Sequence, residues 1–370
     1  MMNQGVIVNL VRIPSVSGSE KMIQKFIEKY SRSIGFVPIW VGDNLVVHIT
    51  GENRSKALLF NAHVDTVPAG NVDLWKYGPF APKSVGGKIY GLGASDEKAA
   101  VAVLLMLAKR FAKVKPACDV WLMFVVAEEI DGSGTQEVVD WFCSHHKDQY
   151  KAIAAVLGEP TNLTTVEIGH KGNIFLRVTI KGSSGHGSVP ISWNDHAVGK
   201  MMDVARILSR LEKQWKKQYR HAVLGSPTIG MVTSIGAGSE GSPNVFPSLC
   251  TATFDIRTTP QLHAKALELI QKAMKSKGVV STVYPPVAYG LTDPKAHIVK
   301  IVKEVTSASV AISHGSNDLC FFSSAGIPAV VYGPGITETM HKINEYVPVK
   351  NINLCISEYE DIIERFSSDT

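Results

Sequence analysis

Histidine and carboxylate side chains follow directly after apolar runs at several points of this 370-residue chain. The first run covers residues 58–62 and ends at His63, with Asp65 two residues further on. Residues two apart in a strand point to the same face, so both side chains should aim the same way. A turn with a hydrogen-bonded histidine and a capping aspartate would explain this segment alone. The recurrence of the pattern elsewhere in the chain favours a functional site.

Three more apolar segments lead into acidic residues. One is followed by a turn with two glycines and Asp96, the next ends at Glu128 and Glu129, and the third ends just before Glu159. Continuous apolar runs are typical of strands that are buried on both faces of a parallel sheet. In such sheets the ligand site lies beyond the carboxyl ends of the strands. Carboxylates gathered there repel one another, so we expect metal cations between them.

Each of these acidic residues has a simpler explanation when it is taken alone. Asp96 stands where the helical segment 99–110 would place an N-cap residue. Glu128 and Glu129 could be two solvated carboxylates in the turn that leads to residues 131–134. Neither explanation accounts for the recurrence of the arrangement.

Composition and charge limit the kinds of protein that this sequence can encode. A hydrophobic content of 45% and a charged content of 19% are typical of a globular protein, and the length suffices for two domains. No apolar run approaches the roughly 20 residues that span a bilayer, so we expect no membrane segment. The net charge of +5 favours anionic substrates, and no basic run with interleaved aromatic residues indicates nucleic acid.

Two further features bear on the cellular compartment. The five cysteines are scattered and form no CxxC pair, which fits reduced thiols. Residues 1–5 lack the basic and apolar regions of a signal peptide. We therefore expect a cytoplasmic protein.

The hydrophobic patterns predict an α/β fold with two domains. The continuous apolar strands predict a catalytic, metal-binding domain with a mostly parallel central sheet flanked by helices. Residues 174–180 and 248–257 instead alternate with period two, which predicts antiparallel strands. With two helical stretches, these strands predict a smaller inserted α+β domain. We expect the catalytic domain to comprise residues 1–171 and 286–370, and the inserted domain residues 172–285.

A last segment, which begins at His341, completes a series of five short motifs. Together these motifs resemble those of the dinuclear zinc amidohydrolases that include acetylornithine deacetylase, succinyl-diaminopimelate desuccinylase, aminoacylase and carboxypeptidase G. The resemblance extends from about residue 8 to residue 365 and includes the inserted domain. In chain order the motifs are Asn61-Ala62-His63-Val64-Asp65-Thr66-Val67-Pro68, Gly91-x-Gly93-x-x-Asp96-x-Lys98, Ala127-Glu128-Glu129, Gly158-Glu159-Pro160-Thr161 and His341-x-x-Asn344-Glu345-Tyr346.

The resemblance implies two divalent metal ions that share one bridging carboxylate, Asp96. His63 and Glu159 would complete one metal site, and Glu129 and His341 the other. Zinc is the expected metal because it accepts imidazole and carboxylate ligands, and cobalt or manganese could replace it.

Three further residues receive catalytic roles from the resemblance. Glu128 would take the proton of a water that bridges the metals and pass it to the leaving amine. Asp65 would bind the second nitrogen of the His63 imidazole. His186, in a loop rich in glycine and serine, would stabilise the oxyanion in the site of a partner subunit. This role implies a homodimer formed through the inserted domain, which would act as a lid. Taken alone, the segment around His186 could equally be an ordinary surface loop.

Four residues are candidates for substrate binding. Asn244 and Arg257 match positions that contact the substrate carboxylate in the resembling enzymes, and arginine suits carboxylate capture. A strand-end arginine paired with a neighbouring acid is the alternative for Arg257. Lys171 resembles the deacetylase branch, where the desuccinylase has arginine, and Gly335 could offer backbone contacts to the substrate.

The chain departs from the usual motif around the bridging aspartate. Leu92 replaces the usual arginine, and Ala99 and Ala100 replace glycines that follow the motif lysine. These changes affect packing and helix entry rather than ligands, so they bear on the subfamily.

We therefore predict a metal-dependent hydrolase that cleaves the amide bond of N-acyl amino acids, of the acetylornithine deacetylase or succinyl-diaminopimelate desuccinylase type. A di- or tripeptidase or a carboxypeptidase with the same site is the first alternative. A non-catalytic binding protein with this fold should have lost a ligand or the base, and none is missing. A redox or nucleotide-binding α/β protein is disfavoured because the third glycine of that fingerprint is absent after Gly91 and Gly93.

Overall fold

The computed structural model describes residues 4–230, 233–238, 241–275 and 277–368. Its backbone contacts divide the chain into two compact units, each with its own sheet and its own hydrophobic core. The first unit comprises Met1–Gly169, Gly290–Ser313 and Asn317–Thr370, and the second comprises His170–Tyr289 and His314–Ser316.

An eight-stranded sheet forms the centre of the first unit. In sheet order its strands are β1 Ile39–Val41, β2 Asn44–Ile49, β6 Cys118–Val125, β3 Asn53–His63, β7 Ala152–Leu157, β19 Ala329–Val331, β8 Thr165–Glu167 and β18 Ser309–Ala311. The middle of the sheet is parallel, because β3 pairs in the same direction with β6 and β7, and β7 pairs likewise with β19. Every residue of β6 is buried, as expected of a strand covered on both faces.

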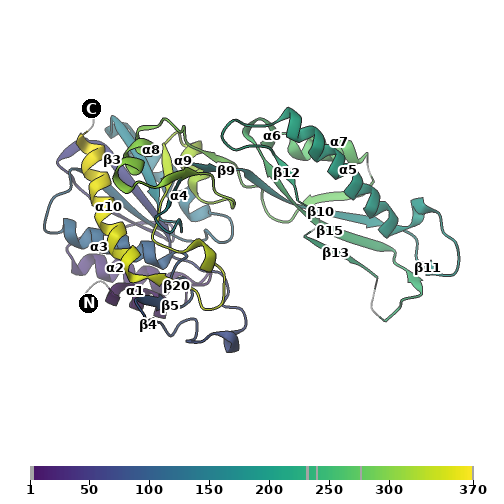
Figure 1. Ribbon diagram of the computed structural model, residues 1–370, viewed down its shortest axis with the longest axis horizontal. Helices are drawn as coiled ribbons and strands as arrows, with labels where there is room; N and C mark the ends of the chain where they lie inside the picture. Colours follow the sequence, from purple (N-terminus) through teal and green to yellow (C-terminus); the bar gives the residue numbers. More distant parts are fainter. Residues whose placement is uncertain (1–3, 231–232, 239–240, 276, 369–370) are drawn as a thin grey trace. The chain divides into compact units, whose positions relative to one another are not determined.

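Helices cover both faces of this sheet (Figure 1). They are α1 Gln4–Arg12, α2 Lys21–Ser33, α3 Lys98–Phe111, α4 Ser133–His145, α8 His297–Thr306, α9 Leu319–Ser324 and α10 Val349–Ser368. Leu59 of β3 packs in one core with Val139 and Phe142 of α4. Its neighbour Phe60 contacts Tyr359 of α10 instead. Because successive strand residues point to opposite faces, α4 and α10 lie on opposite sides of the sheet.

Phe60 offers a test of this core. Its side chain is fully buried, and its ring centroid lies 4.7 Å from that of Tyr359. Since truncation would leave a cavity, we expect Phe60→Ala to lower the free energy of unfolding by about 3–5 kcal/mol. Chemical denaturation measures the change. The control Val114→Ala, at a side chain that is 69% exposed, should stay within about 0.5 kcal/mol of the unmodified chain, and equal losses in both variants would contradict the packing.

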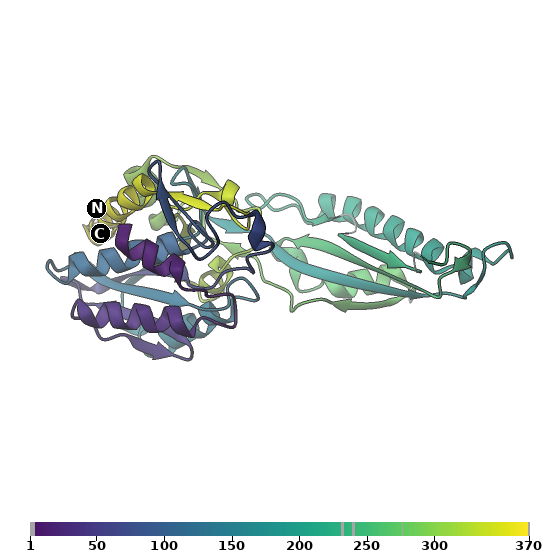
Figure 2. The same cartoon turned by 90° about the horizontal axis from the view of Figure 1, so that it is seen from below.

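The second unit contains an antiparallel sheet. Its strands are β12 Thr228–Ile229, β15 Leu249–Thr258, β10 Gly172–Lys181 and β16 Val279–Thr282, and β13 Ser234–Ala237 also pairs with β15. The inward residues of β10 alternate as the sequence predicts, and they share a core with α5 Ala197–Gln218 and α7 Ala266–Met274. Figure 2 shows α5 lying along this sheet. The predicted α/β fold, with a mostly parallel sheet and a separate antiparallel α+β part, is confirmed.

Within the described ranges, no helix combines the length and the apolar character that a membrane crossing requires.

Candidate metal centre

The carboxyl ends of three parallel strands meet at one edge of the sheet in the first unit. His63 is the last residue of β3 and pairs with Val125 at the end of β6, while Leu157 at the end of β7 pairs with Asn61 of β3. Glu128 and Glu129 follow β6, and Glu159 follows β7, so strand register brings these acidic side chains beside His63. The grouping follows from the parallel sheet, as the sequence predicts.

Asp96 stands between two histidines. It ends the loop that joins β5 Lys88–Tyr90 to α3, and it is almost completely buried. Its Oδ1 atom lies 3.0 Å from Nε2 of His63, and its Oδ2 atom lies 3.2 Å from Nε2 of His341. The two oxygens of one carboxylate therefore face two different imidazoles, which is the arrangement that a bridging ligand needs.

Two further carboxylates complete the cluster. Oε1 of Glu129 lies 3.0 Å from Nε2 of His341, and Oε1 of Glu159 lies 3.8 Å from Nε2 of His63. Ligand atoms of His63, Asp96 and Glu129 all lie within 4.8 Å of one another, and so do those of His63, Glu128 and Glu159. The structure thus brings together all five residues that the sequence predicts as metal ligands. Imidazole nitrogens and carboxylate oxygens at these spacings can hold two divalent cations.

The electrostatics of the cluster are those of a cation site. Burial raises the pKa of Glu159, and the charges of Glu128 and Glu97 raise it further. Hydrogen bonds with Asp96 and Glu129 raise the pKa of His341 to about 10. The carboxylates at this edge therefore disfavour one another's charged form, and bound cations would stabilise that form.

Glu128 lies beside the predicted ligands, and its carboxylate is within 4.8 Å of the ligand atoms of His63 and Glu159. Burial raises its pKa well above the ordinary value, and the charge of Asp318 is the next cause. A carboxylate with a raised pKa can accept a proton near neutral pH and release it again.

Asp65 contacts more groups than the sequence predicts. Nδ1 of His63 lies 3.1 Å from the backbone oxygen of Asp65 and 3.4 Å from its Oδ1. The carboxylate also accepts hydrogen bonds from the backbone N–H groups of Glu128 and Glu129, at 3.2 and 3.1 Å, and from Oγ of Ser17, at 2.7 Å. Asp65 therefore fixes the backbone of the Glu128–Glu129 turn as well as facing the imidazole.

Glu97 and Asp318 are buried carboxylates at this edge that were not predicted as site residues. Oε2 of Glu97 accepts a hydrogen bond from the backbone N–H of His63 at 3.0 Å, and burial raises the pKa of Glu97 to about 8. Asp318 accepts hydrogen bonds from Oγ1 of Thr135 and from Asn61, and burial raises its pKa to about 7. Glu97 directly follows Asp96 in the same motif, and this position could have identified it as a site residue. Asp318 has no comparable signal, because only the fold places it near Glu128.

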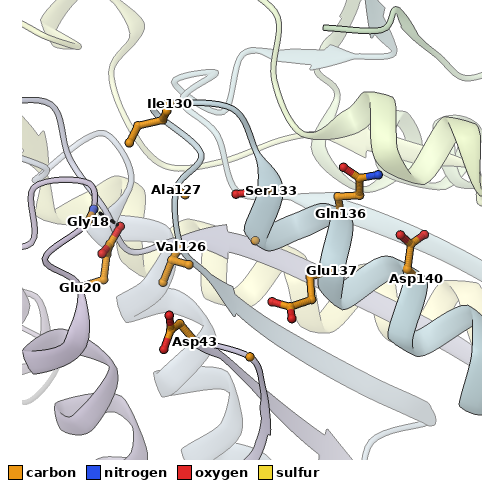
Figure 3. A pocket seen from close by; sticks show the side chains of 12 residues that line it. Gly18, Glu20, Asp43, Val126, Ala127, Ile130, Ser133, Gln136, Glu137 and Asp140 are labelled. Carbon is orange, nitrogen blue, oxygen red and sulfur yellow. Dashed lines mark hydrogen bonds between the residues drawn. The ribbon is translucent and has the colours of Figure 1, made fainter. Parts of the chain in front are cut away.

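A hollow of about 810 Å³ is lined in part by Val126, Ala127 and Ile130, which flank Glu128 and Glu129 in the chain. Figure 3 shows its acidic side chains, Glu20, Asp43, Glu137 and Asp140, and the turn residues Val126, Ala127 and Ile130. None of the predicted ligands is among its lining residues. The hollow is therefore a feature separate from the metal centre.

Gly335, a candidate for substrate contacts, packs tightly in the first unit. A side chain at this position would collide with the backbone of Ser95 and with Pro160. Its carbonyl accepts a hydrogen bond from the backbone N–H of Asn162 at 2.8 Å. The glycine therefore lets three loops approach one another beside Asp96 and Glu159.

The other candidates lie in the second unit and form two groups. Nδ2 of Asn244 lies 3.3 Å from Nε2 of His186, and both side chains are exposed. Arg257 forms a two-pronged ion pair with Asp255, at 2.8 and 2.9 Å, and its Nη1 donates to Ser316. Oγ of Ser316 in turn donates to the backbone oxygen of Lys171. Burial and the charge of Arg257 lower the pKa of Lys171, so two cationic groups lie near one another here.

The family follows from a comparison of the whole chain with known proteins. The model of peptidase family M20/M25/M40 matches residues 59–365. The chain belongs to this family. The resemblance inferred from the motifs is thereby confirmed, and the protein is an enzyme of a family of dinuclear metal-dependent peptidases and amidohydrolases.

Relatives of this M20/M25/M40 enzyme include a desuccinylase, a carboxypeptidase and a tripeptidase. The succinyl-diaminopimelate desuccinylase of Acinetobacter baylyi is 26% identical, with 97% of each chain covered. Among solved structures, the M20 metallo-carboxypeptidase Sso-CP2 of Sulfolobus solfataricus has a TM-score of 0.77 at 18% identity, with 99% of each chain covered. A tripeptidase of Staphylococcus aureus has a TM-score of 0.75 at 20% identity, with 99% of this chain and 98% of that chain covered. The two solved structures show that the fold is shared.

Proposed function

We propose that this M20/M25/M40 enzyme hydrolyses the amide bond of N-acyl amino acids in the cytoplasm, as an acetylornithine deacetylase or succinyl-diaminopimelate desuccinylase would. The observation that carries the hydrolytic part is the Asp96 carboxylate, which faces His63 with one oxygen and His341 with the other, near the half-buried Glu128. The similarity to a succinyl-diaminopimelate desuccinylase over 97% of both chains supports the substrate class.

The donor set suits a pair of divalent cations, with zinc preferred and cobalt or manganese as alternatives. His63 and Glu159 would hold one ion, Glu129 and His341 the other, and Asp96 both. When bound, the pair supplies a water molecule of lowered pKa as the nucleophile.

Glu128 is proposed as the general base. Its raised pKa lets it hold a proton taken from the attacking water and deliver that proton to the amine as the amide bond breaks. Asp65 keeps this base in place, because its carboxylate binds the backbone N–H groups of Glu128 and Glu129. A base must reach the proton that it removes, so this anchoring is part of the proposed mechanism.

The second unit is proposed to recognise the substrate and to form a homodimer. His186 would stabilise the developing oxyanion in the site of a partner subunit, and Asn244 beside it would contact the substrate carboxylate. Arg257 is already paired with Asp255, so the substrate carboxylate would meet its Nη1 atom together with Lys171. Gly335 is proposed to offer backbone contacts to the substrate.

A substrate screen tests the proposed specificity. The metal-loaded enzyme should hydrolyse N-acetyl or N-succinyl amino acids with a kcat/KM at least tenfold above that for dipeptides, a difference of about 1.4 kcal/mol in transition-state binding. Release of the free amine, measured by mass spectrometry, reports every substrate on one scale. Hydrolysis of dipeptides alone would replace this proposal by the di- or tripeptidase or carboxypeptidase alternative.

A further inference from the structure

Two segments that are far apart in the chain meet beside Asp96. The loop 91–97 leads from β5 to Asp96, and the segment 341–345 leads from His341 to β20 Tyr346–Pro348. Strands β5 and β20 pair in antiparallel fashion, with Tyr90 opposite Tyr346. Glu345 precedes this pair and its side chain is 1% exposed, although no role in metal binding or catalysis has been assigned to it above.

The Glu345 carboxylate is enclosed by backbone donors of the other segment. Its Oε1 accepts hydrogen bonds from the N–H groups of Ser95 at 2.6 Å and Asp96 at 2.9 Å, and its Oε2 accepts one from Gly93 at 2.9 Å. Its own carbonyl accepts from the N–H of Gly91 at 3.0 Å. Three converging N–H groups therefore satisfy both oxygens of this buried side chain. One side chain thus fixes the whole loop that presents Asp96.

Glu345 also anchors the short segment that begins at His341, because its backbone N–H donates a hydrogen bond to the carbonyl of Lys342 at 3.2 Å. The imidazole of His341 is 49% exposed, whereas that of His63 is 1% exposed. Packing therefore restrains the His63 ring much more than the His341 ring. The backbone of His341 and Asn344 has positive φ, at 55° and 64°, which non-glycine residues keep only where surrounding contacts impose it. Glu345 ends this segment, and its carboxylate ties the segment to the loop that carries Asp96.

We propose that Glu345 is a positioning residue that fixes the bridging ligand Asp96 and the ligand His341 in place relative to each other. This inference rests on the proposed function, because it assumes that these two side chains bind metal. One metal site, formed by His63, Glu159 and Asp96, has one ligand held by Glu345. The other metal site, formed by Glu129, His341 and Asp96, has two ligands held by Glu345, namely His341 and Asp96. Loss of the Glu345 carboxylate therefore weakens the His341 site more than the His63 site.

Zinc titration of the metal-free protein tests this inference without an activity measurement. Glu345→Gln keeps the shape of the side chain but places an amide group against an N–H donor. We expect calorimetry to show two zinc ions bound to the unmodified protein. In the variant, one ion should keep its affinity within a few-fold and the other should bind about 10–100-fold more weakly. Substitution of residues that orient metal ligands usually weakens metal binding by this amount. The control Glu338→Gln, at an exposed carboxylate three residues before His341, should bind as the unmodified protein does.

The His341→Ala variant identifies which site is affected. Because His341→Ala already disables the His341 site, Glu345→Gln should change zinc binding less in that background than in the unmodified protein. Equal effects in both backgrounds, or no effect in either, would overturn the inference. If Glu345→Gln does not fold by circular dichroism, Glu345→Asp is titrated with the same expectation, since its carboxylate is withdrawn by one methylene. Failure of the unmodified protein to bind two zinc ions would instead refute the proposed function.

Discussion

Glu128→Gln is expected to lower kcat by about 10²–10⁴-fold, the usual contribution of a positioned proton-transfer group. Glutamine has nearly the same shape as glutamate but cannot take the proton of the attacking water or deliver it to the leaving amine. The backbone N–H of Glu128 donates a hydrogen bond to Asp65, and this bond does not involve the substituted side chain, so the substitution should leave the turn in place. The zinc content should therefore stay unchanged while the rate falls.

Steady-state kinetics and metal analysis of the same preparation separate these two outcomes. Glu52→Gln, the same exchange at an exposed position, controls for the loss of one negative charge and should retain full activity. A Glu128→Gln enzyme with unchanged kcat would refute the assigned base. A variant that loses its zinc as well would show that Glu128 acts as a ligand, which its position beside His63 and Glu159 also allows geometrically.

Asp96→Asn is expected to abolish the activity through loss of both metal ions. The two oxygens of Asp96 face His63 and His341, at 3.0 and 3.2 Å, so one substitution removes a ligand from each proposed site. Without the ions, the pKa of the attacking water returns from about 7 toward 15.7, and the rate should fall by several orders of magnitude. Metal analysis after dialysis against zinc-buffered solution should find both ions lost from the variant and two ions per chain in the unmodified enzyme.

Chelation of the unmodified enzyme provides the matched comparison. A strong chelator should reduce its activity to the level of Asp96→Asn, and added zinc should restore the unmodified enzyme but not the variant. An Asp96→Asn enzyme that keeps two tightly bound ions and its activity would show that the bridging carboxylate is wrongly assigned.

The sequence predicted the parts of this site that depend on strand pattern. Apolar runs before His63, Glu128 and Glu159 identified three buried parallel strands, and parallel strands must end at the same edge of a sheet. The alternation in β10 and β15 likewise predicted the antiparallel sheet, because one period-two face is buried there. These predictions succeeded because local periodicity determines which face of a strand is buried.

Other features of the site depend on contacts that no local pattern encodes. Asp65 binds the turn at Glu128 and Glu129, more than 60 residues later, only because β3 and β6 lie side by side. Asp318 lies near Glu128 through its place at the start of α9. Glu345 was visible in its motif, but its carboxylate acquires a function only when the segment folds over the Asp96 loop. Such supporting residues emerge from tertiary packing.

Diffraction from crystals grown with excess zinc, measured at the zinc absorption edge, tests the central claim most directly. We predict two anomalous peaks per chain, about 3.5–4 Å apart, with Asp96 between them. His63 and Glu159 should coordinate one ion, and Glu129 and His341 the other. A single peak at saturating zinc, or two ions held by other side chains, would contradict this account.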